Sequence, residues 1–331
     1  MSKIKIVTID GDGIGPSIMD STKKVLKTLN PNFEFINALA GLQAQEKTGT
    51  LLPQETIDLI KAHKTALKSP LQTPIGHGFK SINVQLRKEL DLFANVRPIK
   101  TFQESLDLTI IRENTEGLYA GEQETTPTAG IATSIMTHEG CKRIIQYAID
   151  YAKKNNRKKI TLVHKANILK TTSGLMLKTF KDMTSSNQDF EFNDLIVDNA
   201  CMQLVMHPER FDVIVTSNLF GDILSDLCAG LIGGLGLAPG SNIGHDSSIF
   251  EAVHGTAPDI VGKNLANPTA LILSANLMLK QLNLMEESTL LEKTLKNVYL
   301  HDKKHLTGDM GGNLGTIEFT EYLCKKLHEN K

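Results

Sequence analysis

Short apolar runs alternate with amphipathic stretches along most of the chain, and this alternation limits the possible folds more than any other feature. Strand-like runs occur at residues 3–10, 33–37, 92–97, 106–112, 159–164, 195–198 and 212–216. Helix-like patterns lie between most of them, at residues 17–29, 53–63, 139–155 and 175–183. Strands that alternate with helices favour a largely parallel sheet covered by helices, so we expect an α/β protein.

Two segments interrupt this alternation. Residues 120–136 are polar, contain Pro127 and several threonines, and predict an inserted β arm. Residues 233–244 are rich in glycine and indicate a loop or a crossing between domains. A length of 331 residues suggests two domains or one large two-lobed unit.

The loop GDGIGP, which follows the first strand pattern, invites a dinucleotide-binding interpretation. The Rossmann fingerprint GxGxxG places its glycines where the backbone approaches a pyrophosphate. Here the glycines are Gly11, Gly13 and Gly15, and Pro16 stands in the last position. A tight turn between strand and helix explains them as well, so this loop alone assigns no cofactor.

Composition argues against several classes of partner. The formal net charge of −1, from 36 basic and 37 acidic residues, provides no overall attraction to nucleic acid or an anionic membrane. The chain has no run of 18 apolar residues and enters a strand pattern directly, so we expect neither a membrane span nor a targeting segment. Four cysteines without CxxC spacing favour reduced thiols and a cytoplasmic location: Cys141, Cys201, Cys228 and Cys324.

Three arginines stand on short consecutive segments, at Arg87, Arg97 and Arg112. The last two close strand patterns, and open α/β sheets bind ligands beyond the carboxyl ends of their strands. Each guanidinium can bind a carboxylate through two parallel hydrogen bonds. A single arginine is more often a surface ion-pair partner, but the three together predict a polyanionic small-molecule ligand.

Asp222 and Asp226 stand four residues apart, which places both carboxylates on one face of a helix. Like charges at this spacing repel each other, and a divalent cation would remove that penalty. Asp198, which closes a strand pattern, offers a third hard oxygen ligand for Mg2+ or Mn2+. A polar helix face is the alternative for the first two residues, and their spacing alone favours it.

These residues belong to motifs by which the chain resembles the isocitrate and isopropylmalate dehydrogenase family of metal-dependent β-decarboxylating dehydrogenases. The motifs occur in order over nearly the whole chain: GDGIGP, the SxNxxLR block at Ser81, Asn83 and Arg87, LFANVRP, RENTEGLYAG, HKANILK, VDNACMQLV, NLFGDILSD and EAVHGTAPDIVGKNLANP.

The resemblance implies a two-lobed α/β fold that is distinct from the Rossmann fold. Residues 1–95 and 233–331 would form a large domain on the cofactor side. Residues 96–232 would form a small domain with the metal site, the dimer interface and a β clasp arm at about 119–137.

The resemblance also assigns roles. Arg87, Arg97 and Arg112 would hold the substrate carboxylates, and Asp222 and Asp226 would bind Mg2+ or Mn2+ together with Asp198 of the partner subunit. Lys165, also from the partner, would accept the proton of the substrate hydroxyl, and Tyr119 would protonate carbon after decarboxylation. Both residues could instead be structural. The implied assembly is a homodimer with shared active sites.

Ser81 and Asn83 bear on the substrate, because isocitrate enzymes of the family use these positions to bind a further carboxylate. An alkyl group there would leave a hydroxyl and an amide without partners. We therefore expect NAD-dependent oxidative decarboxylation of isocitrate to 2-oxoglutarate and CO2. Homoisocitrate and 3-isopropylmalate are the alternative substrates, and His77 and Phe79 in the preceding loop leave the pocket size open.

Asp259 and Ile260 occupy positions where NADP-dependent relatives commonly carry Lys and Tyr, and a carboxylate repels a 2′-phosphate, so we expect NAD. A helix cap is the structural alternative for Asp259. The resemblance implies a cofactor site that also contains Thr73, Asn167, Glu251, His254, Gly255, Thr256, Ala257 and Asn267. A non-catalytic regulatory subunit is the alternative of a different class, although such subunits lose catalytic residues that this chain retains.

Overall fold

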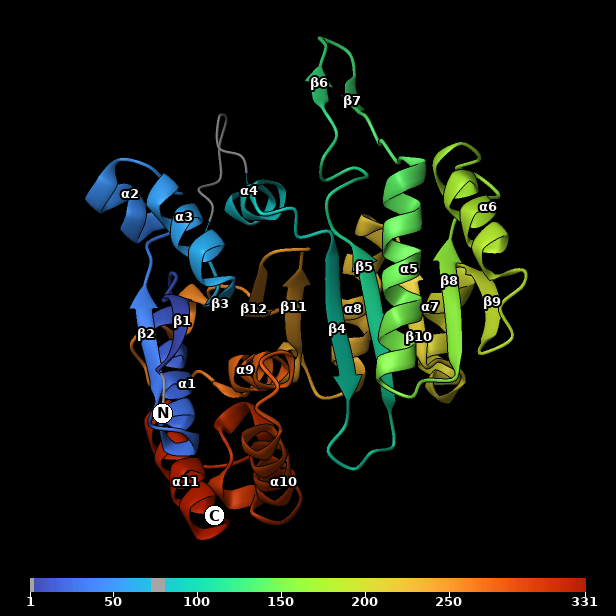
Figure 1. Cartoon of the computed structure of the whole chain (residues 1–331). Helices are drawn as coiled ribbons and strands as arrows, with labels where there is room; N and C mark the ends of the chain where they lie inside the picture. Colours follow the sequence, from blue (N-terminus) through green and yellow to red (C-terminus); the bar gives the residue numbers. More distant parts are fainter. Residues whose placement is uncertain (1–2, 73–80) are drawn as a thin grey trace. The chain divides into compact units, whose positions relative to one another are not determined.

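The computed structural model describes residues 3–72 and 81–331. The chain divides into two compact units, which Figure 1 colours along the sequence. Unit 1 consists of Met1–Leu90, Gly233–Ser241 and His245–Lys331, and unit 2 consists of Asp91–Ile232 and Asn242–Gly244.

These bounds differ from the predicted domain limits at two places. Residues 91–95 belong to unit 2, because they lead into β4 (Ala94–Lys100), which pairs with β5 (Asp107–Glu113). Residues 242–244 also belong to unit 2, because β11 (Pro239–Ile243) carries the chain from one unit into the other.

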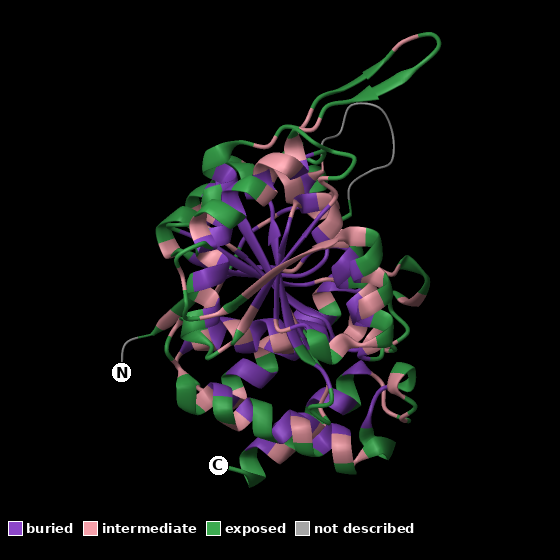
Figure 2. Ribbon diagram, turned by 90° about the vertical axis from the view of Figure 1, so that its right-hand side faces the viewer, coloured by how far each residue is buried: buried purple, intermediate pink, exposed green. Residues whose placement is uncertain are grey.

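Unit 1 contains a sheet whose neighbouring strands follow the order β2, β1, β3, β12 and β11. β1 pairs in parallel with β2 and β3, and β3 pairs in parallel with β12. The bounds of these strands are β1 (Ile4–Ile9), β2 (Phe33–Asn37), β3 (Thr65–Lys68) and β12 (Ser248–Ala252). β3 and β12 are buried throughout and β1 over its last four residues, whereas β2 is buried only at Phe33; Figure 2 colours the chain by burial.

Helices cover this sheet. α9 packs against β3 and β12, α1 packs against α9 and α11, and α3 packs against β1. The helices of unit 1 are α1 (Gly15–Leu29), α2 (Leu42–Thr48), α3 (Gln54–His63), α4 (Ile82–Glu89), α9 (Thr269–Gln281), α10 (Met285–His301) and α11 (Thr316–Glu329). Short 3-10 turns are η2 (Leu235–Leu237), η3 (Pro258–Ile260), η4 (Lys303–His305) and η5 (Gly308–Met310).

Unit 2 has strands in the order β4, β5, β10, β8 and β9. β5, β10, β8 and β9 are parallel, and β4 is antiparallel to β5. The remaining elements are β8 (Lys159–His164), β9 (Glu191–Ile196), β10 (Val213–Thr216), α5 (His138–Lys154), α6 (Thr172–Thr184), α7 (Val197–Met206), α8 (Asn218–Leu231) and η1 (Pro208–Arg210).

The two faces of this sheet differ in character. Ile111 points into an apolar core with residues of α5 and α6, including Ile144 and Phe180. Its neighbour Arg112 points to the other face, where α8 lies, because side chains alternate along a strand. The polar site residues of unit 2 therefore lie on the α8 face.

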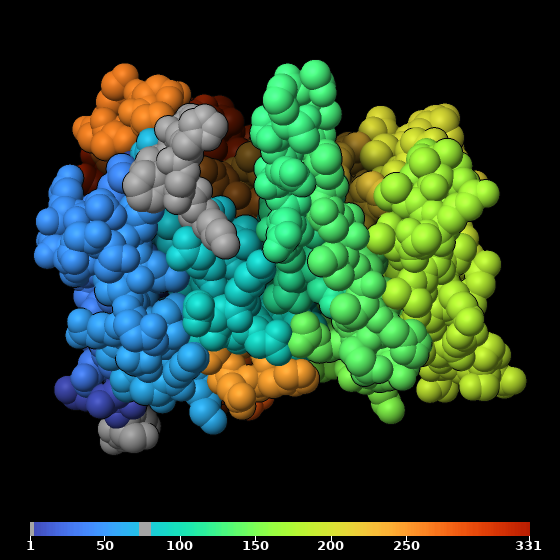
Figure 3. Space-filling view, turned by 90° about the horizontal axis from the view of Figure 1, so that it is seen from above, coloured from blue at the N-terminus to red at the C-terminus, as the bar shows by residue number. Residues whose placement is uncertain are grey.

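The expected β arm is present as an antiparallel pair, β6 (Gln123–Thr125) and β7 (Gly130–Ala132), with a further bridge between Gly117 and Ile135. Its strand residues are exposed, and Figure 3 shows the arm as a narrow green ridge. The clasp role expected for it stays a prediction. No helix among the described residues is long and apolar enough to cross a membrane.

Two expected positions are wrong. Asp198 does not close a strand, because β9 ends at Ile196 and Asp198 lies in the first turn of α7, where a carboxylate is favoured by the helix dipole. Arg97 does not close a strand either, because β4 continues to Lys100. Arg97 still lies near Arg112, because β4 is antiparallel to β5 and begins beside the end of β5.

The glycines of GDGIGP lie against protein backbone. A Cβ on Gly11 would lie 2.3 Å from the carbonyl oxygen of Pro70, and one on Gly13 would lie 2.2 Å from that of Thr256. The adjacent Ile14 amide donates to the same Thr256 oxygen at 3.0 Å. These glycines therefore allow the first loop to pack on two other loops of unit 1.

This packing predicts a specific loss of stability. Gly13 and Gly49 both have positive φ, of 61° and 76°, but a Cβ on Gly49 would have nothing within 4 Å. We expect Gly49→Ala to lower the free energy of unfolding by about 1–2 kcal/mol, because alanine is strained in a left-handed backbone conformation. Gly13→Ala should lower the free energy of unfolding by about 1–3 kcal/mol more than Gly49→Ala does, because the new methyl group overlaps Thr256. Urea unfolding followed by circular dichroism measures both, and equal losses would contradict the packing argument.

Candidate active site

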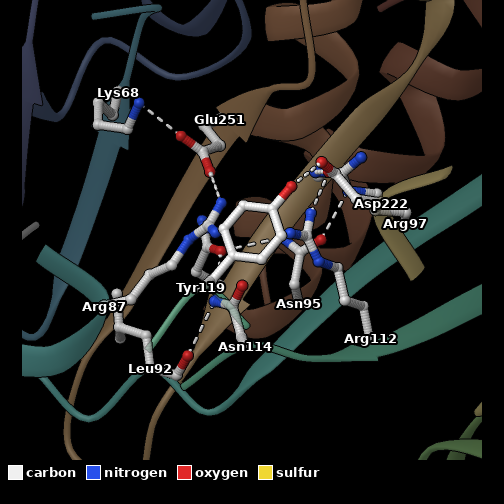
Figure 4. Close-up of polar contacts among 12 residues, drawn as sticks. Lys68, Arg87, Leu92, Asn95, Arg97, Arg112, Asn114, Tyr119, Asp222 and Glu251 are labelled. Atoms are coloured by element: carbon white, nitrogen blue, oxygen red, sulfur yellow. Dashed lines mark hydrogen bonds and ion pairs between the residues drawn. The ribbon is translucent and has the colours of Figure 1, made fainter. Parts of the chain in front are cut away.

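Three elements of unit 2, β4, β5 and α8, hold a cluster of charged side chains (Figure 4). Arg112 on β5 is almost fully buried, with 1% of its surface exposed. Its stem lies against Gly221 of α8, where a Cβ would approach the arginine Cγ to 2.5 Å. The glycine in NLFGDILSD therefore provides room for Arg112.

The Arg112 guanidinium is bound on two sides by α8. Nη1 donates to Asp222 Oδ1, and Nε and Nη2 donate to Asn218 Oδ1 at 3.1 and 2.7 Å. Asn218 and Asp222 stand four residues apart and so share one helix face. Arg112 is thus fixed by two oxygens before any ligand is considered.

Arg97, on β4, contacts the same helix. Its Nη2 lies 3.4 Å from Asp222 Oδ1, and its Nη1 lies 3.5 Å from Asp226 Oδ1 and donates to Ser225. Its Nε donates to Asn95 Oδ1 at 2.6 Å. The structure therefore brings together Arg97, Arg112, Asp222 and Asp226, and their formal charges cancel.

Tyr119 closes one side of the cluster. Its hydroxyl donates to Asp222 Oδ2 at 2.6 Å, and the Arg112 guanidinium lies 5.0 Å from the centre of its ring. Burial, followed by the hydrogen bond to Asp222, raises the pKa of Tyr119. The phenol is therefore protonated at neutral pH and can act as a proton donor.

The carboxylates of α8 remain accessible. The side chain of Asp222 is 37% exposed and that of Asp226 is 59% exposed. Partial burial raises the pKa of Asp226, and Arg97 opposes that shift. Both offer hard oxygen atoms, the ligand type that Mg2+ and Mn2+ prefer.

Asp198 and Lys165 form a separate pair in the same unit. Lys165 Nζ donates to Asp198 Oδ1 at 2.6 Å, and this contact lowers the pKa of the carboxyl. Within residues 3–72 and 81–331, no three Asp, Glu, His or Cys side chains converge as one metal site. One chain thus offers two carboxylates on α8 and a third that is bound to Lys165.

In unit 1, Ser81 and Asn83 lie at the start of α4, and Arg87 lies in its last turn. Ser81 precedes the helix without capping it, and Asn83 and Arg87 stand one turn apart on the same face. Asn83 Oδ1 is buried without a hydrogen-bond partner in the described structure. Because Oδ1 is an acceptor, it favours a group that donates a hydrogen bond, whereas a carboxylate would accept from the side-chain NH2 of Asn83.

Glu251, at the end of β12, links two basic side chains of unit 1. Its Oε2 lies 2.5 Å from Lys68 Nζ, and its Oε1 lies 3.9 Å from Arg87 Nη2 (Figure 4). Lys68 is buried and was missed by sequence reasoning. A buried lysine needs an acidic partner, but a single sequence does not identify one 183 residues away.

The predicted cofactor residues from Glu251 to Asn267 form one continuous stretch between β12 and α9. It includes Gly255, Thr256, Asp259 and Ile260, and Ala257 has left-handed φ and ψ of 42° and 64°. His254 Nδ1 donates to the Gly255 carbonyl at 3.0 Å, and its Nε2 is buried without a partner among the described residues. Burial lowers the pKa of His254, so a neutral ring presents Nε2 as an acceptor.

Asn267 is bound by the protein itself. Its side chain accepts from the Thr269 amide at 3.0 Å and donates to Asp309 at 3.0 Å, and it is buried. Asn167 is exposed in the turn after β8, in unit 2. Thr73, His77 and Phe79 lie outside the described residues.

Sequence reasoning also missed Asn218 and Ser225, which hold the arginines. Both lie three or four residues from Asp222, so the helical spacing that identified Asp226 could have identified them. Asn95 and Asn114 were missed as well. Each donates to Asn242 Oδ1, at 2.9 and 3.0 Å, and no local pattern predicts this contact.

Fold and site together define a two-unit α/β protein with paired arginines and aspartates and a polar, glycine-rich loop stretch. The family model for isocitrate/isopropylmalate dehydrogenase matches residues 5–323. The chain belongs to this family.

Relatives in this family carry different names. The chain is 44% identical to a catalytic chain of the mitochondrial NAD isocitrate dehydrogenase of Arabidopsis thaliana, named catalytic subunit 5, over 96% of this chain and 87% of that protein. It is 46% identical to a regulatory chain of the mitochondrial NAD isocitrate dehydrogenase of Dictyostelium discoideum, over 99% and 94%. It is 44% identical to 3-isopropylmalate dehydrogenase of Methanothermobacter thermautotrophicus, over 99% and 100%.

Among solved structures, the isocitrate dehydrogenase of Methylococcus capsulatus matches with a TM-score of 0.95 and 46% identity, over 99% of both chains. The expected family and the two-lobed α/β fold are thereby confirmed.

The contact between Tyr119 and Asp222 predicts an unusual titration. We expect Tyr119 to ionise above the ordinary tyrosine pKa of about 10, because its folded pKa is raised. The neutral phenol therefore contributes stability below about pH 10 that is lost as pH rises through the folded pKa. The pKa of Tyr119 is measured by NMR of the protein labelled with 13C at tyrosine Cζ, and Tyr119→Phe assigns its signal.

Asp222→Asn should lower the pKa of Tyr119, although burial keeps it raised. Asp226→Asn is the matched control and should leave it unchanged, because Asp226 is not among the groups that shift Tyr119. A Tyr119 pKa at or below about 10, or one that Asp222→Asn does not change, would show that the two side chains do not interact.

Proposed function

We propose that the protein is an NAD-dependent isocitrate dehydrogenase, which oxidises and decarboxylates isocitrate to 2-oxoglutarate and CO2. Relatives of equal identity are named for isocitrate and for 3-isopropylmalate, so overall similarity does not choose between the substrates. The observation that carries the choice is the polar start of α4, with Ser81 just before the helix and the Asn83 side chain one turn from Arg87.

The two substrates place different groups at this position. A carboxylate can accept hydrogen bonds from Ser81 and from the Asn83 amide, whereas an alkyl group can satisfy neither. Leaving a buried polar group unsatisfied costs about 1–3 kcal/mol. Ser81 and Asn83 are partly buried, and a substrate that covers them without accepting their hydrogen bonds would incur this cost. The cost favours isocitrate over isopropylmalate, and a ligand one methylene longer remains the closer competitor.

The arginines would bind the other carboxylates of the substrate. Arg97 and Arg112 face Asp222 in the cluster, and Arg87 faces Glu251 in unit 1. An incoming carboxylate would compete with these acidic side chains for the guanidinium groups. Binding of a divalent cation to Asp222 and Asp226 would draw those carboxylates from the arginines and thereby favour substrate binding.

Asp222 and Asp226 fit a Mg2+ or Mn2+ ion because both are accessible hard oxygen donors on one helix face. The third donor is proposed to be Asp198 of the partner subunit. Bound there, the ion would act as a Lewis acid toward the substrate hydroxyl and the ketone formed from it.

The stretch from Glu251 to Asn267 would hold NAD, which accepts the hydride from the substrate carbon. The buried, unpartnered His254 Nε2 supports a polar ligand at this stretch. Asp259 is exposed, and its negative charge would oppose the 2′-phosphate of NADP.

Two side chains would transfer protons. Lys165 accepts the proton of the substrate hydroxyl during oxidation, and its contact with Asp198 holds it in place. Tyr119 donates a proton to carbon after CO2 leaves, because its raised pKa keeps the hydroxyl protonated at neutral pH. General acids and bases of this kind contribute about 10²–10⁴ to the rate.

The active unit is proposed to be a homodimer in which Lys165 and Asp198 serve the site of the partner. Exposed apolar side chains on α7 and α8 support a docking surface there: Met202, Val205, Met206 and Ile223. We propose a cytoplasmic location, in keeping with the reduced cysteines.

A non-catalytic regulatory role is the second candidate, because a relative with that name is 46% identical. This chain retains Tyr119, Lys165 and all three aspartates, which a regulatory subunit does not need. Activity of the purified chain without any other subunit decides between the two.

The substrate proposal is tested by kcat/KM for isocitrate, homoisocitrate and 3-isopropylmalate, with NAD and Mg2+. We expect isocitrate to give the highest value. Asn83→Leu should lower kcat/KM for isocitrate by about 5- to 150-fold, the equivalent of 1–3 kcal/mol, and should improve isopropylmalate relative to it. A preference of the unmodified enzyme for isopropylmalate would refute the proposal.

The shared site is tested by mixing inactive variants. Tyr119→Phe and Lys165→Met should each lower kcat by about 10²–10⁴. If the residues come from different chains, refolding the two variants together should restore about a quarter of normal activity, because half of the dimers are hybrids with one intact site.

Tyr119→Phe mixed with Asp222→Asn is the matched control and should stay inactive, because these residues lie 2.6 Å apart in one chain. Failure of the first mixture to recover would mean that Tyr119 and Lys165 do not act across a dimer.

A further inference from the structure

Unit 2 contains a cavity whose lining includes none of the residues of the charged cluster on α8. It has a volume of about 340 Å³ and is lined by residues of β8, β9, α7 and η1 and by Phe211, which follows η1. Thr161 of β8 lines it, four residues before Lys165, so about 13 Å of strand separates it from the proposed proton acceptor. None of the residues that line the cavity is a proposed active-site residue, although Asn199 directly follows Asp198.

Two polar atoms in the cavity wall have no hydrogen-bond partner among the described residues. Thr161, with 1% of its surface exposed, presents Oγ1, and Asn193 presents Oδ1 from the paired position on β9. Buried polar atoms in folded proteins are almost always paired. Two adjacent exceptions that line one cavity indicate a ligand that supplies hydrogen bonds.

The charged residues of the lining are both basic. Lys159 lies on the same strand face as Thr161 and also contacts Glu191 at 2.8 Å. Arg210 of η1 donates to Gln203 of α7 at 2.8 Å, and no acidic residue lines the cavity. An anionic group is therefore favoured near Lys159 and Arg210.

Size and apolar surface restrict the ligand further. The volume is at the lower end of the roughly 300–1,000 Å³ of ligand pockets, which fits a small molecule better than a nucleotide. Leu195 and Phe211 add apolar contacts for a short carbon skeleton. We propose that this cavity binds a small hydroxycarboxylic acid, with its carboxylate near Arg210 and Lys159 and its hydroxyl bound to Asn193 and Thr161.

Such a ligand would contact elements that also carry proposed active-site residues. Asn199 and Gln203 line the cavity from α7, and Asp198 precedes Asn199 in the first turn of that helix. Lys165 directly follows β8. The binding site itself does not depend on the proposed reaction.

Isothermal titration calorimetry with L-malate tests the site, with succinate as the matched acid without a hydroxyl, in EDTA and without NAD. We expect malate to bind more tightly than succinate. Thr161→Val should weaken malate binding by about 2- to 12-fold, the effect of one hydrogen bond, and Arg210→Gln by at least about tenfold. Thr161→Val should not lower the Tm, because the hydroxyl it removes has no protein partner.

Two controls separate this site from others. Lys178→Gln removes an exposed charge from α6 and should leave malate binding unchanged. Arg97→Gln alters the proposed active site and should also leave malate binding at the cavity unchanged. Arg87→Gln replaces this control if Arg97→Gln does not fold. The proposal fails if malate does not bind, if both cavity variants bind it normally, or if the Arg97→Gln or Arg87→Gln control abolishes binding.

Discussion

The ion pair between Arg112 and Asp222 is the contact on which the rest of the site depends. A guanidinium buried to 1% exposure is tolerated only with acceptors on several sides, and β5 and α8 meet so that Asp222 and Asn218 provide them. Because Asp222 itself is 37% exposed, water can reach its side of the pair, but the guanidinium of Arg112 would be left buried without this acceptor if Asp222 were removed. The charges proposed for substrate binding thus also hold α8 on the sheet.

Because the same side chains are proposed to bind ligands and also hold α8 on the sheet, their charges must balance in the protein itself. Arg97 and Arg112 face Asp222 and Asp226, so neither sign is left uncompensated on the α8 face. Anions and cations can then replace protein partners one for one, at much lower cost than the desolvation of an isolated charge. Tyr119 is positioned by the same carboxylate that neutralises Arg112, which couples its protonation to the state of the arginines.

The sequence predicted local features well and long-range contacts poorly. Periodicity located β2 and β8 to the residue, because β2 largely alternates apolar and polar residues and β8 is a mostly apolar segment bounded by Lys159 and His164. It misplaced both ends of β9: the polar residues Glu191, Asn193 and Asp194 hid its start, and Val197 and Asp198 suit a first helical turn as well as a strand. It could not give the antiparallel direction of β4, which brings Arg97 beside Arg112, since strand pairing depends on residues far apart in the sequence. The pairs Arg112 with Asp222, 110 residues apart, and Lys68 with Glu251 are invisible to spacing rules for the same reason.

The substrate is a question that the fold does not answer. The chain is 44% identical to relatives named for two different acids, and those acids share the carboxylates and hydroxyl that Arg97, Arg112 and the metal site would bind. What differs between the acids is one substituent, so selectivity must come from the few side chains that meet it. Ser81 and Asn83 stand on one end of a short helix, where changing them would disturb no sheet contact. A polar pair at this position mainly weakens the binding of an alkyl group and adds less to the binding of a carboxylate. Selectivity of this kind can change with two substitutions while the rest of the fold stays constant.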